Sequence, residues 1–445
     1  MLFLLSAAED GKEISCKKFK WTLRGDDGQI HEGIGQCEKG KNFVLRTECF
    51  RPGFVHLTCI ALSEDGTPDQ NFDVCDAGAG ADVQKLRYHD TVPSDFDAYW
   101  GEIEAMIDGF TPRLLEKTPY TCDVPEGFDC FDVKISTPLE TPASGYLSLP
   151  KGTGPFPLII SFRGYSVVGA QPSFTKNAIH LNLNAHGIEN GLKSEEYALK
   201  YPQLAEYGFR IEENTSPYTT YWRNMMIRNL TALKFLKTLP EWNKKDLEAH
   251  GGSQGALQAT TCAAHDKDVT FLDILVPWFC DLNAESDGYM QGWRPSFARG
   301  LRYFDTAAQA TRVKCPVRIS ARLGDYVCPP ATVMTLYHNF YVKKSIEFIQ
   351  SGTHGYLPPE IEKFTLFHDP AKPEEEILPG RYRHFKGKEY QVLFTAKNSE
   401  TLENMVVYKA LYGTGDIWVR PASMWNELVS LGDRQVYRFT FLSET

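Results

Sequence analysis

The residues Gly251-Gly252-Ser253-Gln254-Gly255 are the most informative segment of this chain of 445 residues, and a run of small residues follows them. Glycines on both sides of a serine allow the sharp strand-to-helix turn that lifts a serine hydroxyl above a sheet. This pattern predicts Ser253 as a nucleophile. The alternative is a glycine-rich turn that only enters a buried helix, because a match of five residues also arises by chance in long proteins.

Around this turn, apolar strands alternate with helices. A helix with Met226, Leu230 and Leu233 on one face is expected to end before Pro240, just ahead of the turn. The predicted strands are 158–162, 179–183, 271–276, 317–319 and 346–349. This alternation indicates an α/β fold with a doubly wound, mostly parallel sheet that helices cover on both faces.

The chain is long enough for two or three domains. We expect an N-terminal immunoglobulin-like β-sandwich at 1–87, an α/β domain at 88–367 and a small β-rich domain at 377–445. Ser94 is predicted to cap the first helix of the second domain. The proline- and acid-rich segment from His368 to Glu376 is predicted to be a linker, because such a composition cannot pack a core.

Charge and cysteine usage argue against several classes of protein. The formal net charge of -10, without a long basic run, argues against a nucleic-acid partner. Eleven cysteines contain no Cys-x-x-Cys pair and no close Cys/His cluster, so we expect no metal site and mainly reduced thiols. No apolar run approaches the ~18 residues that span a bilayer, and Leu2-Phe3-Leu4-Leu5 lacks a basic segment before it. These features predict a cytoplasmic protein without a membrane partner, or a secreted one if a signal peptide has been trimmed.

A serine nucleophile needs a base, and the base needs a carboxylate that orients it. Downstream of Ser253, Asp325 and His354 each follow a predicted strand, in the order Ser, acid, His that sheet-based hydrolases use. Both residues are therefore expected at the edge of the sheet that carries Ser253. Taken alone, Asp325 could bond its own turn and His354 could be a solvated loop residue. Of the other histidines that follow Ser253, three fall within predicted helices or the linker: His265, His338 and His368.

The negative charge that develops on an ester oxygen needs fixed hydrogen-bond donors. The backbone N–H of Gln254, directly after the nucleophile, is one predicted donor. The backbone N–H of Tyr165 is the second, since Arg163-Gly164-Tyr165-Ser166 follows an early strand. Without Ser253, the Arg163-Gly164 pair would be interpreted as a turn that ends a strand.

Seven segments between about residues 88 and 365 resemble, in the same order, the acetyl xylan esterase and cephalosporin-C deacetylase family, which is carbohydrate esterase family seven of the α/β-hydrolases. They are Pro93–Trp100, Arg163–Ser166, Gly251–Ala256, Val276–Asp281, Tyr303–Thr306, Lys314–Val317 and Asp325–Pro330. The resemblance implies an α/β-hydrolase domain, a triad of Ser253, Asp325 and His354, and oxyanion donors at Tyr165 and Gln254. It also implies deacetylation of acetylated xylo-oligosaccharides or other small acetyl esters through an acetyl-serine intermediate, with no cofactor.

Two segments depart from the family pattern. Ala185-His186-Gly187-Ile188 stands where the family has Arg-Gly-Gln, and Gly355 stands where a glutamate follows the histidine. The first departure concerns the family's hexamer and its substrate preference, and the second concerns the support of the histidine loop. The sequence leaves the oligomeric state open, a homo-oligomer included.

The tail, with Gly380–Tyr390 and Val406–Gly413, is similar to a compact bacterial domain family of unknown function. Its aromatic and basic residues could line a ligand groove, but so small a domain needs most of its aromatics for its own core. Two alternatives for the whole chain remain. One is a hydrolase of bulkier esters or peptides on the same fold, and the other is a carbohydrate-binding protein with a defunct site.

Overall fold

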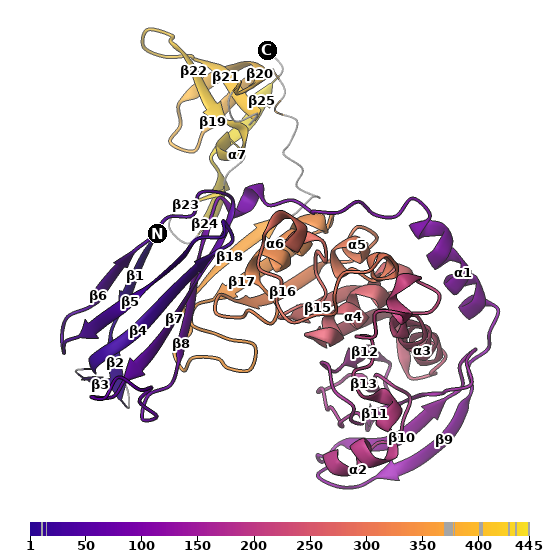
Figure 1. The fold of residues 1–445 in the computed structure, drawn as a ribbon. Coiled ribbons are helices and arrows are strands. Elements are labelled where there is room, and N and C mark those ends of the chain that lie inside the picture. The colour runs from indigo at the N-terminus through magenta and orange to yellow at the C-terminus, as the bar shows by residue number, and fades with distance from the viewer. Residues whose placement is uncertain are drawn as a thin grey trace. The chain divides into compact units, whose positions relative to one another are not determined.

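The computed structural model describes residues 1–9, 12–14, 16–368, 377, 379–399, 404–425, 428–431 and 434–443 (Figure 1). The chain forms two compact units, Met1–His368 and Asp369–Thr445. Residues 369–376 of the predicted linker lie outside the described residues. His368, which we assigned to the linker, instead ends a β-strand. The division of the first unit into a sandwich and a catalytic domain stays a prediction.

A ten-stranded sheet forms the centre of the first unit, in the order β18-β17-β16-β15-β14-β12-β13-β11-β10-β9. The strands from β13 to β17 in this order are parallel, and antiparallel strands flank them on both sides. The α/β prediction is therefore confirmed. The strands are β9 (Leu114–Tyr120), β10 (Phe128–Ile135), β11 (Ala143–Pro150), β12 (Phe156–Phe162), β13 (Ile179–Asn184), β14 (Trp242–Gly252), β15 (Phe271–Leu275), β16 (Val317–Arg322), β17 (Lys344–Ile349) and β18 (Lys363–His368).

The order of the strands places the candidate site. The chain leaves β12, forms β13 on one side of it and returns to form β14 on the other side, and all three strands are parallel. Ligands bind at the carboxyl ends of strands where the strand order reverses in this way. Ser253 directly follows β14, and Arg163-Gly164-Tyr165 directly follows β12.

The helices are α1 (Phe96–Asp108), α2 (Ser194–Lys200), α3 (Tyr221–Leu236), α4 (Gln254–His265), α5 (Thr306–Ala310), α6 (Pro330–Asn339) and, in the tail, α7 (Ala422–Trp425). Helices α3, α4, α5 and α6 pack side by side in one layer (Figure 1). On the sheet itself, polar and partly exposed side chains such as Asn182, His250 and Arg318 line a cleft of about 640 Å³. The expectation that both faces are covered is wrong for this part of the sheet.

Local sequence explains where the helices lie. Thr220 caps α3, because its side chain accepts a hydrogen bond from the Trp222 N–H. Small side chains such as Ala256 and Ala259 are fully buried in α4, and they let this helix approach the sheet closely. The predicted cap of α1 is wrong, because the N-cap position is Asp95 rather than Ser94, and Asp95 makes no side-chain capping bond. Among the described residues, no helix is both long enough and apolar enough to cross a bilayer.

The N-terminal strands form antiparallel sheets, one of four strands in the order β5-β4-β7-β8 and two of two strands. Phe19, Leu23 and Leu57 form a separate core for them, as the alternating pattern predicts. Phe54 packs instead into the core of the large sheet, 5.5 Å from the Phe348 ring. The strands are β1 (Leu2–Leu5), β2 (Ala7–Glu9), β3 (Lys12–Ile14), β4 (Cys16–Gly25), β5 (Ile30–Cys37), β6 (Phe43–Arg46), β7 (Gly53–Leu62) and β8 (Cys75–Ala81).

The second unit is a β domain, as predicted. Its main sheet is antiparallel, in the order β22-β21-β20-β19-β25, with a separate hairpin of β23 and β24. The core contains Tyr382, Val392, Tyr408 and Trp425. The strands are β19 (Gly380–His384), β20 (Glu389–Lys397), β21 (Asn404–Ala410), β22 (Ile417–Pro421), β23 (Leu428–Leu431), β24 (Arg434–Tyr437) and β25 (Phe439–Ser443).

Candidate active site

Ser253 lies on the turn between β14 and α4 in a backbone conformation that few residues adopt, with φ 55° and ψ -121°. Such a conformation persists only where surrounding contacts hold it. Here the Ser253 N–H donates to the Leu275 carbonyl at 2.9 Å, and the Ser253 carbonyl accepts from the Trp278 N–H at 3.3 Å. The sharp strand-to-helix turn expected around Ser253 is present.

The glycines on either side of Ser253 are required by close backbone contacts. A Cβ on Gly251 would lie 2.0 Å from the Gly255 carbonyl oxygen. A Cβ on Gly255 would lie 2.2 Å from the Phe162 carbonyl oxygen, at the end of β12. Any side chain at either position would therefore push the turn apart or move it away from β12.

His354 lies within hydrogen-bonding distance of both other residues of the predicted triad. His354 Nε2 lies 3.1 Å from Ser253 Oγ, and His354 Nδ1 lies 2.9 Å from Asp325 Oδ2. The Asp325 side chain is 1% exposed, whereas the His354 side chain is 29% exposed. This geometry suits a histidine that takes a proton from the serine while the buried carboxylate orients the ring.

The loop that carries Asp325 holds its carboxylate from the other side. Asp325 Oδ1 accepts hydrogen bonds from the backbone N–H groups of Val327 and Cys328, both at 3.0 Å. Burial raises the pKa of the Cys328 thiol well above its usual value, and a hydrogen bond with the Ser253 hydroxyl partly opposes this. Cys328 therefore contacts two members of the candidate triad. Sequence reasoning assigned it no role.

Arg322 supports the loop that carries His354. Its Nη1 lies 2.9 Å from the His354 carbonyl oxygen and also donates to the carbonyls of Thr353 and Tyr356. Arg322 is 7% exposed at the end of β16. Gly355 stands where the family has a glutamate, so the sequence left the support of this loop unexplained. The Arg322 guanidinium supplies that support, because it binds three backbone carbonyls of the loop.

The two predicted oxyanion donors lie on segments next to Ser253. Gln254 opens α4 directly after Ser253, so its N–H is at the positive end of the helix dipole. Tyr165 follows Gly164, where a Cβ would lie 3.6 Å from the Cβ of Ser253. Neither the Tyr165 nor the Gln254 N–H donates a hydrogen bond to any described residue. Both donors therefore remain available for an anionic oxygen.

A buried hydrogen-bond network lies behind this pair of donors. The Tyr207 hydroxyl accepts a bond of 2.8 Å from the Gln254 side-chain amide and one of 3.2 Å from the Ser166 N–H. The Tyr165 ring stacks on the Tyr207 ring at a centroid distance of 4.2 Å. One tyrosine thus connects the loops of both predicted donors.

His186 belongs to the segment that departs from the family pattern, and it completes this network. Its Nε2 lies 2.8 Å from the Ser166 carbonyl oxygen, so Nε2 carries the proton, and Nδ1 accepts from the Tyr221 hydroxyl at 2.6 Å. Burial lowers the pKa of His186 to about 4. A neutral imidazole therefore holds the loop of Arg163 to Ser166 throughout the neutral pH range.

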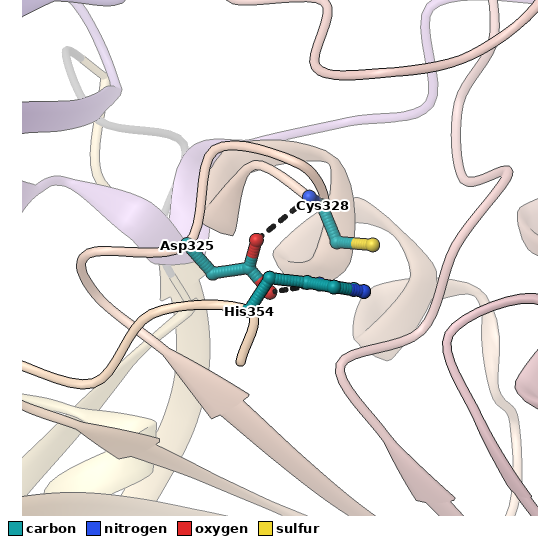
Figure 2. Close-up of side chains that lie close together, drawn as sticks. All are labelled: Asp325, Cys328 and His354. Atoms are coloured by element: carbon teal, nitrogen blue, oxygen red, sulfur yellow. Dashed lines mark hydrogen bonds and ion pairs between the residues drawn. The ribbon is translucent and has the colours of Figure 1, made fainter. Parts of the chain in front are cut away.

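Asp325, Cys328 and His354 also form a cluster of potential metal ligands, shown in Figure 2, with one ligand atom from each within 4.8 Å of the others. The carboxylate and the imidazole already bond to each other, as the dashed line shows. A cation that binds here would have to displace this bond. The carboxylate and the imidazole therefore have hydrogen-bond partners without a cation.

Two other downstream histidines have different partners. His265 bonds the side chains of Glu104 and Gln309, and His338 bonds the Val83 carbonyl. Burial lowers the pKa of His338. Neither histidine contacts Ser253 among the described interactions, so the structure brings His354 to the serine and leaves the other two in structural positions.

Two family models match this chain. The family model described as "Acetyl xylan esterase (AXE1)" matches residues 80–287 and 294–368, which is more than half of the chain. The model described as "Protein of unknown function (DUF1653)" matches residues 380–441. These two matches cover the segments whose motifs resemble the two families.

An acetyl esterase of Xylanibacter ruminicola is 27% identical over 305 residues, which cover 63% of this chain and 66% of that protein. This chain thus spans slightly less than two thirds of the relative's length. Structures of the acetyl xylan esterases from Paenibacillus sp. R4 and Thermoanaerobacterium sp. JW/SL YS485 are both 19% identical, with a TM-score of 0.51. Each match covers 62% of this chain and 94% or 93% of the matched esterase chain. The two matches support the α/β fold of this chain. The acetyl xylan esterase family model covers more than half of the chain. The chain therefore belongs to the acetyl xylan esterase family of carbohydrate esterases.

Proposed function

We propose that this protein removes acetyl groups from acetylated xylo-oligosaccharides or similar small acetylated sugars. The observation that carries the proposal is the chain of hydrogen bonds from Ser253 through His354 to Asp325. A serine hydroxyl becomes nucleophilic when a base takes its proton as the new bond forms. Membership of the acetyl xylan esterase family makes an acetyl ester the first substrate to test.

In the first half of the reaction, Ser253 Oγ attacks the acetyl carbonyl carbon while its proton moves to His354 Nε2. The carbonyl oxygen becomes an anion, which the N–H groups of Tyr165 and Gln254 stabilise. Asp325 stabilises the imidazolium that forms. The tetrahedral intermediate then breaks its bond to the sugar oxygen, which takes the proton from His354 and leaves as a free hydroxyl.

The second half removes the acetyl group from the enzyme. Water attacks the acetyl-serine carbonyl, and His354 accepts the proton that water loses. The same two N–H groups stabilise the second oxyanion. The intermediate then breaks its bond to Ser253 Oγ, which takes the proton from His354, and acetate leaves. The reaction therefore needs no redox step and no group other than water.

Aromatic residues belong to the segments around Ser253. The backbone N–H of Trp278 donates to the Ser253 carbonyl. Trp278 also lines a small cavity of about 10 Å³ together with Trp293 and Cys328. Tyr165 and Trp293 also lie close together, with ring centroids 4.8 Å apart. A cavity of this size holds at most about one water molecule. The preference for a small acyl group therefore rests on family membership.

The test compares kcat/KM for acetylated xylo-oligomers, cephalosporin C and aryl esters of increasing acyl length. We expect activity on the acetylated substrates and a decrease of at least ~10-fold from acetyl to butyryl, which corresponds to ~1.4 kcal/mol of lost transition-state stabilisation. A preference for longer acyl chains or for peptides would support the alternative hydrolase. The Ser253→Ala variant serves as the control, and undiminished turnover in that variant would overturn the assignment of the nucleophile.

A further inference from the structure

We propose that the four-stranded N-terminal sheet is a positioning element of the active site, in which His56, Asp76 and Gly78 hold the two loops that carry Asp325 and His354. These N-terminal residues touch neither the nucleophile nor the reacting atoms, so they are positioning residues. The inference rests on the proposed role of the triad, because it concerns the support of two triad members.

The first contact is a stack of two rings beneath the Asp325 loop. His56 on β7 lies flat against Tyr326, the residue after Asp325, with ring centroids 3.9 Å apart and planes inclined by 17°. The Tyr326 hydroxyl is buried and has no hydrogen-bond partner among the described residues. Packing therefore sets the position of this ring, and His56 supplies one of its two faces.

Asp76 on β8 fixes the stacked histidine. Its Oδ1 lies 2.7 Å from His56 Nε2 and accepts a second bond of 3.0 Å from the Thr58 hydroxyl. The side chains of His56 and Asp76 are only 15% and 21% exposed. Asp76 also packs against the turn before Asp325, where a Cβ on Gly324 would lie 2.8 Å from the Asp76 Cβ. Asp76 on β8 thus supports Gly324 directly and Tyr326 through His56.

The second contact holds the start of the His354 loop. Gln350, directly after β17, accepts a bond of 3.0 Å from the Gly78 N–H and donates one of 2.9 Å to the Gly78 carbonyl. The side-chain amide therefore binds β8 in the way that a neighbouring strand would. A Cβ on Gly78 would lie 2.4 Å from the Leu323 carbonyl oxygen, so the strand also contacts the Asp325 loop without space for a side chain.

These contacts bring the strand pair β7 and β8 against the loops that carry Asp325 and His354. The His354 Nδ1 to Asp325 Oδ2 distance of 2.9 Å depends on the relative position of the two loops. A misplacement of ~1 Å can cost ~100-fold in rate, because catalysis needs reacting groups in near-attack geometry. Loss of a positioning contact should therefore lower kcat and leave KM, which depends on substrate contacts elsewhere, nearly unchanged.

The test measures kcat and KM for an aryl acetate in full-length His56→Ala, His56→Phe and Gln350→Met. Alanine removes the stack, phenylalanine retains a flat ring on Tyr326, and methionine keeps the length of Gln350 without its two hydrogen bonds. His31→Ala is the matched control, because His31 is an exposed histidine on β5 of the same sheet. Ser253→Ala is assayed in parallel.

We expect kcat to fall ~10-fold in His56→Ala and Gln350→Met, with KM within ~2-fold of the wild-type value, as loss of a transition-state contact predicts. His56→Phe should restore most of the lost kcat, and His31→Ala should match the wild type. In the proton NMR spectrum, the low-field signal of the proton between His354 and Asp325 should weaken or shift in His56→Ala and remain in His31→Ala. A role in stability alone would leave kcat and this signal unchanged in folded variants.

Wild-type kcat in both folded variants would overturn the inference. If His56→Ala does not fold, Gln350→Met decides the question alone: a lowered kcat supports the positioning role, and an unchanged kcat overturns it. Failure of the proposed function has a different signature, since Ser253→Ala would then retain the turnover of the wild type.

Discussion

The Tyr207 hydroxyl accepts a 2.8 Å hydrogen bond from the side chain of Gln254, the residue proposed to supply one oxyanion donor. The same hydroxyl accepts from the Ser166 N–H, next to the proposed second donor at Tyr165. Tyr207 is 1% exposed, so water cannot replace these bonds. The relative position of the two donors therefore depends on one buried hydroxyl group.

We predict that Tyr207→Phe lowers kcat ~10-fold on an aryl acetate, because loss of an oxyanion donor itself costs ~100-fold or more and loss of its positioning should cost less. The ring and its stack on Tyr165 remain. Steady-state kinetics provide the measurement. Tyr341→Phe is the control, since Tyr341 is 69% exposed. Equal kcat values for the two variants would contradict the role assigned to Tyr207.

The triad predicts a ranking of three substitutions. Ser253→Ala and His354→Ala should each lower kcat by ~10⁴-fold or more, because removal of either group stops nucleophilic attack. Asp325→Asn should be less damaging, since the carboxylate orients and stabilises without bonding to substrate. Stopped assays with a chromogenic acetate measure all three. If His338→Ala removes activity while His354→Ala does not, the base is assigned wrongly.

Asp305 predicts a pH dependence of stability. Burial, and then the neighbouring Asp281 carboxylate, raise the pKa of Asp305 to about 7, while three backbone N–H groups lower it in part. The folded state therefore holds this proton more tightly than the unfolded state, whose pKa is ~3.9. Between pH ~4 and ~7 the unfolded state binds fewer protons, so the free energy of unfolding decreases as the pH rises.

Asp305→Asn cannot lose this proton. We expect the Tm of the wild type to fall relative to the Tm of Asp305→Asn from pH 5 to pH 8, because only the wild type loses stability through this group. Differential scanning calorimetry gives both values. Asp129→Asn is the control, because the Asp129 side chain is 56% exposed. A Tm difference that stays constant with pH would show that Asp305 does not titrate in this range.

The tail predicts a tolerated deletion. All residues proposed for catalysis precede His368, where the first compact unit ends, and the tail has its own core. Removal of Glu374 to Thr445 should therefore leave kcat/KM on a small aryl acetate within ~2-fold of the full-length value, as expected for domains that fold separately. A truncated protein that is folded by circular dichroism but inactive would show that the tail completes the active site.

The sequence predicted the parts of the site that local chemistry requires. Gly251 and Gly255 predict the turn at Ser253, because the turn leaves no space for a side chain at either position. A Cβ added there would lie only 2.0 or 2.2 Å from a backbone carbonyl oxygen. Parallel strands present their carboxyl ends at one edge, so the sequence alone predicts that Asp325 and His354 lie near the serine. The same reasoning failed for the cap of α1, where Ser94 and Asp95 are equally suitable in composition and only the path of the chain distinguishes them.

Only the tertiary structure determined what holds these residues in place. Arg322, Tyr207, His56 and Gln350 carry no motif, and each lies far from Ser253 in the sequence. Their roles depend on which strands become neighbours, such as β8 beside the loops after β16 and β17. The sequence by itself predicted Ser253, Asp325 and His354 as the candidate triad, because their spacing follows strand and turn geometry. The supporting contacts required the fold, because packing between distant segments leaves no periodic or local pattern in the sequence.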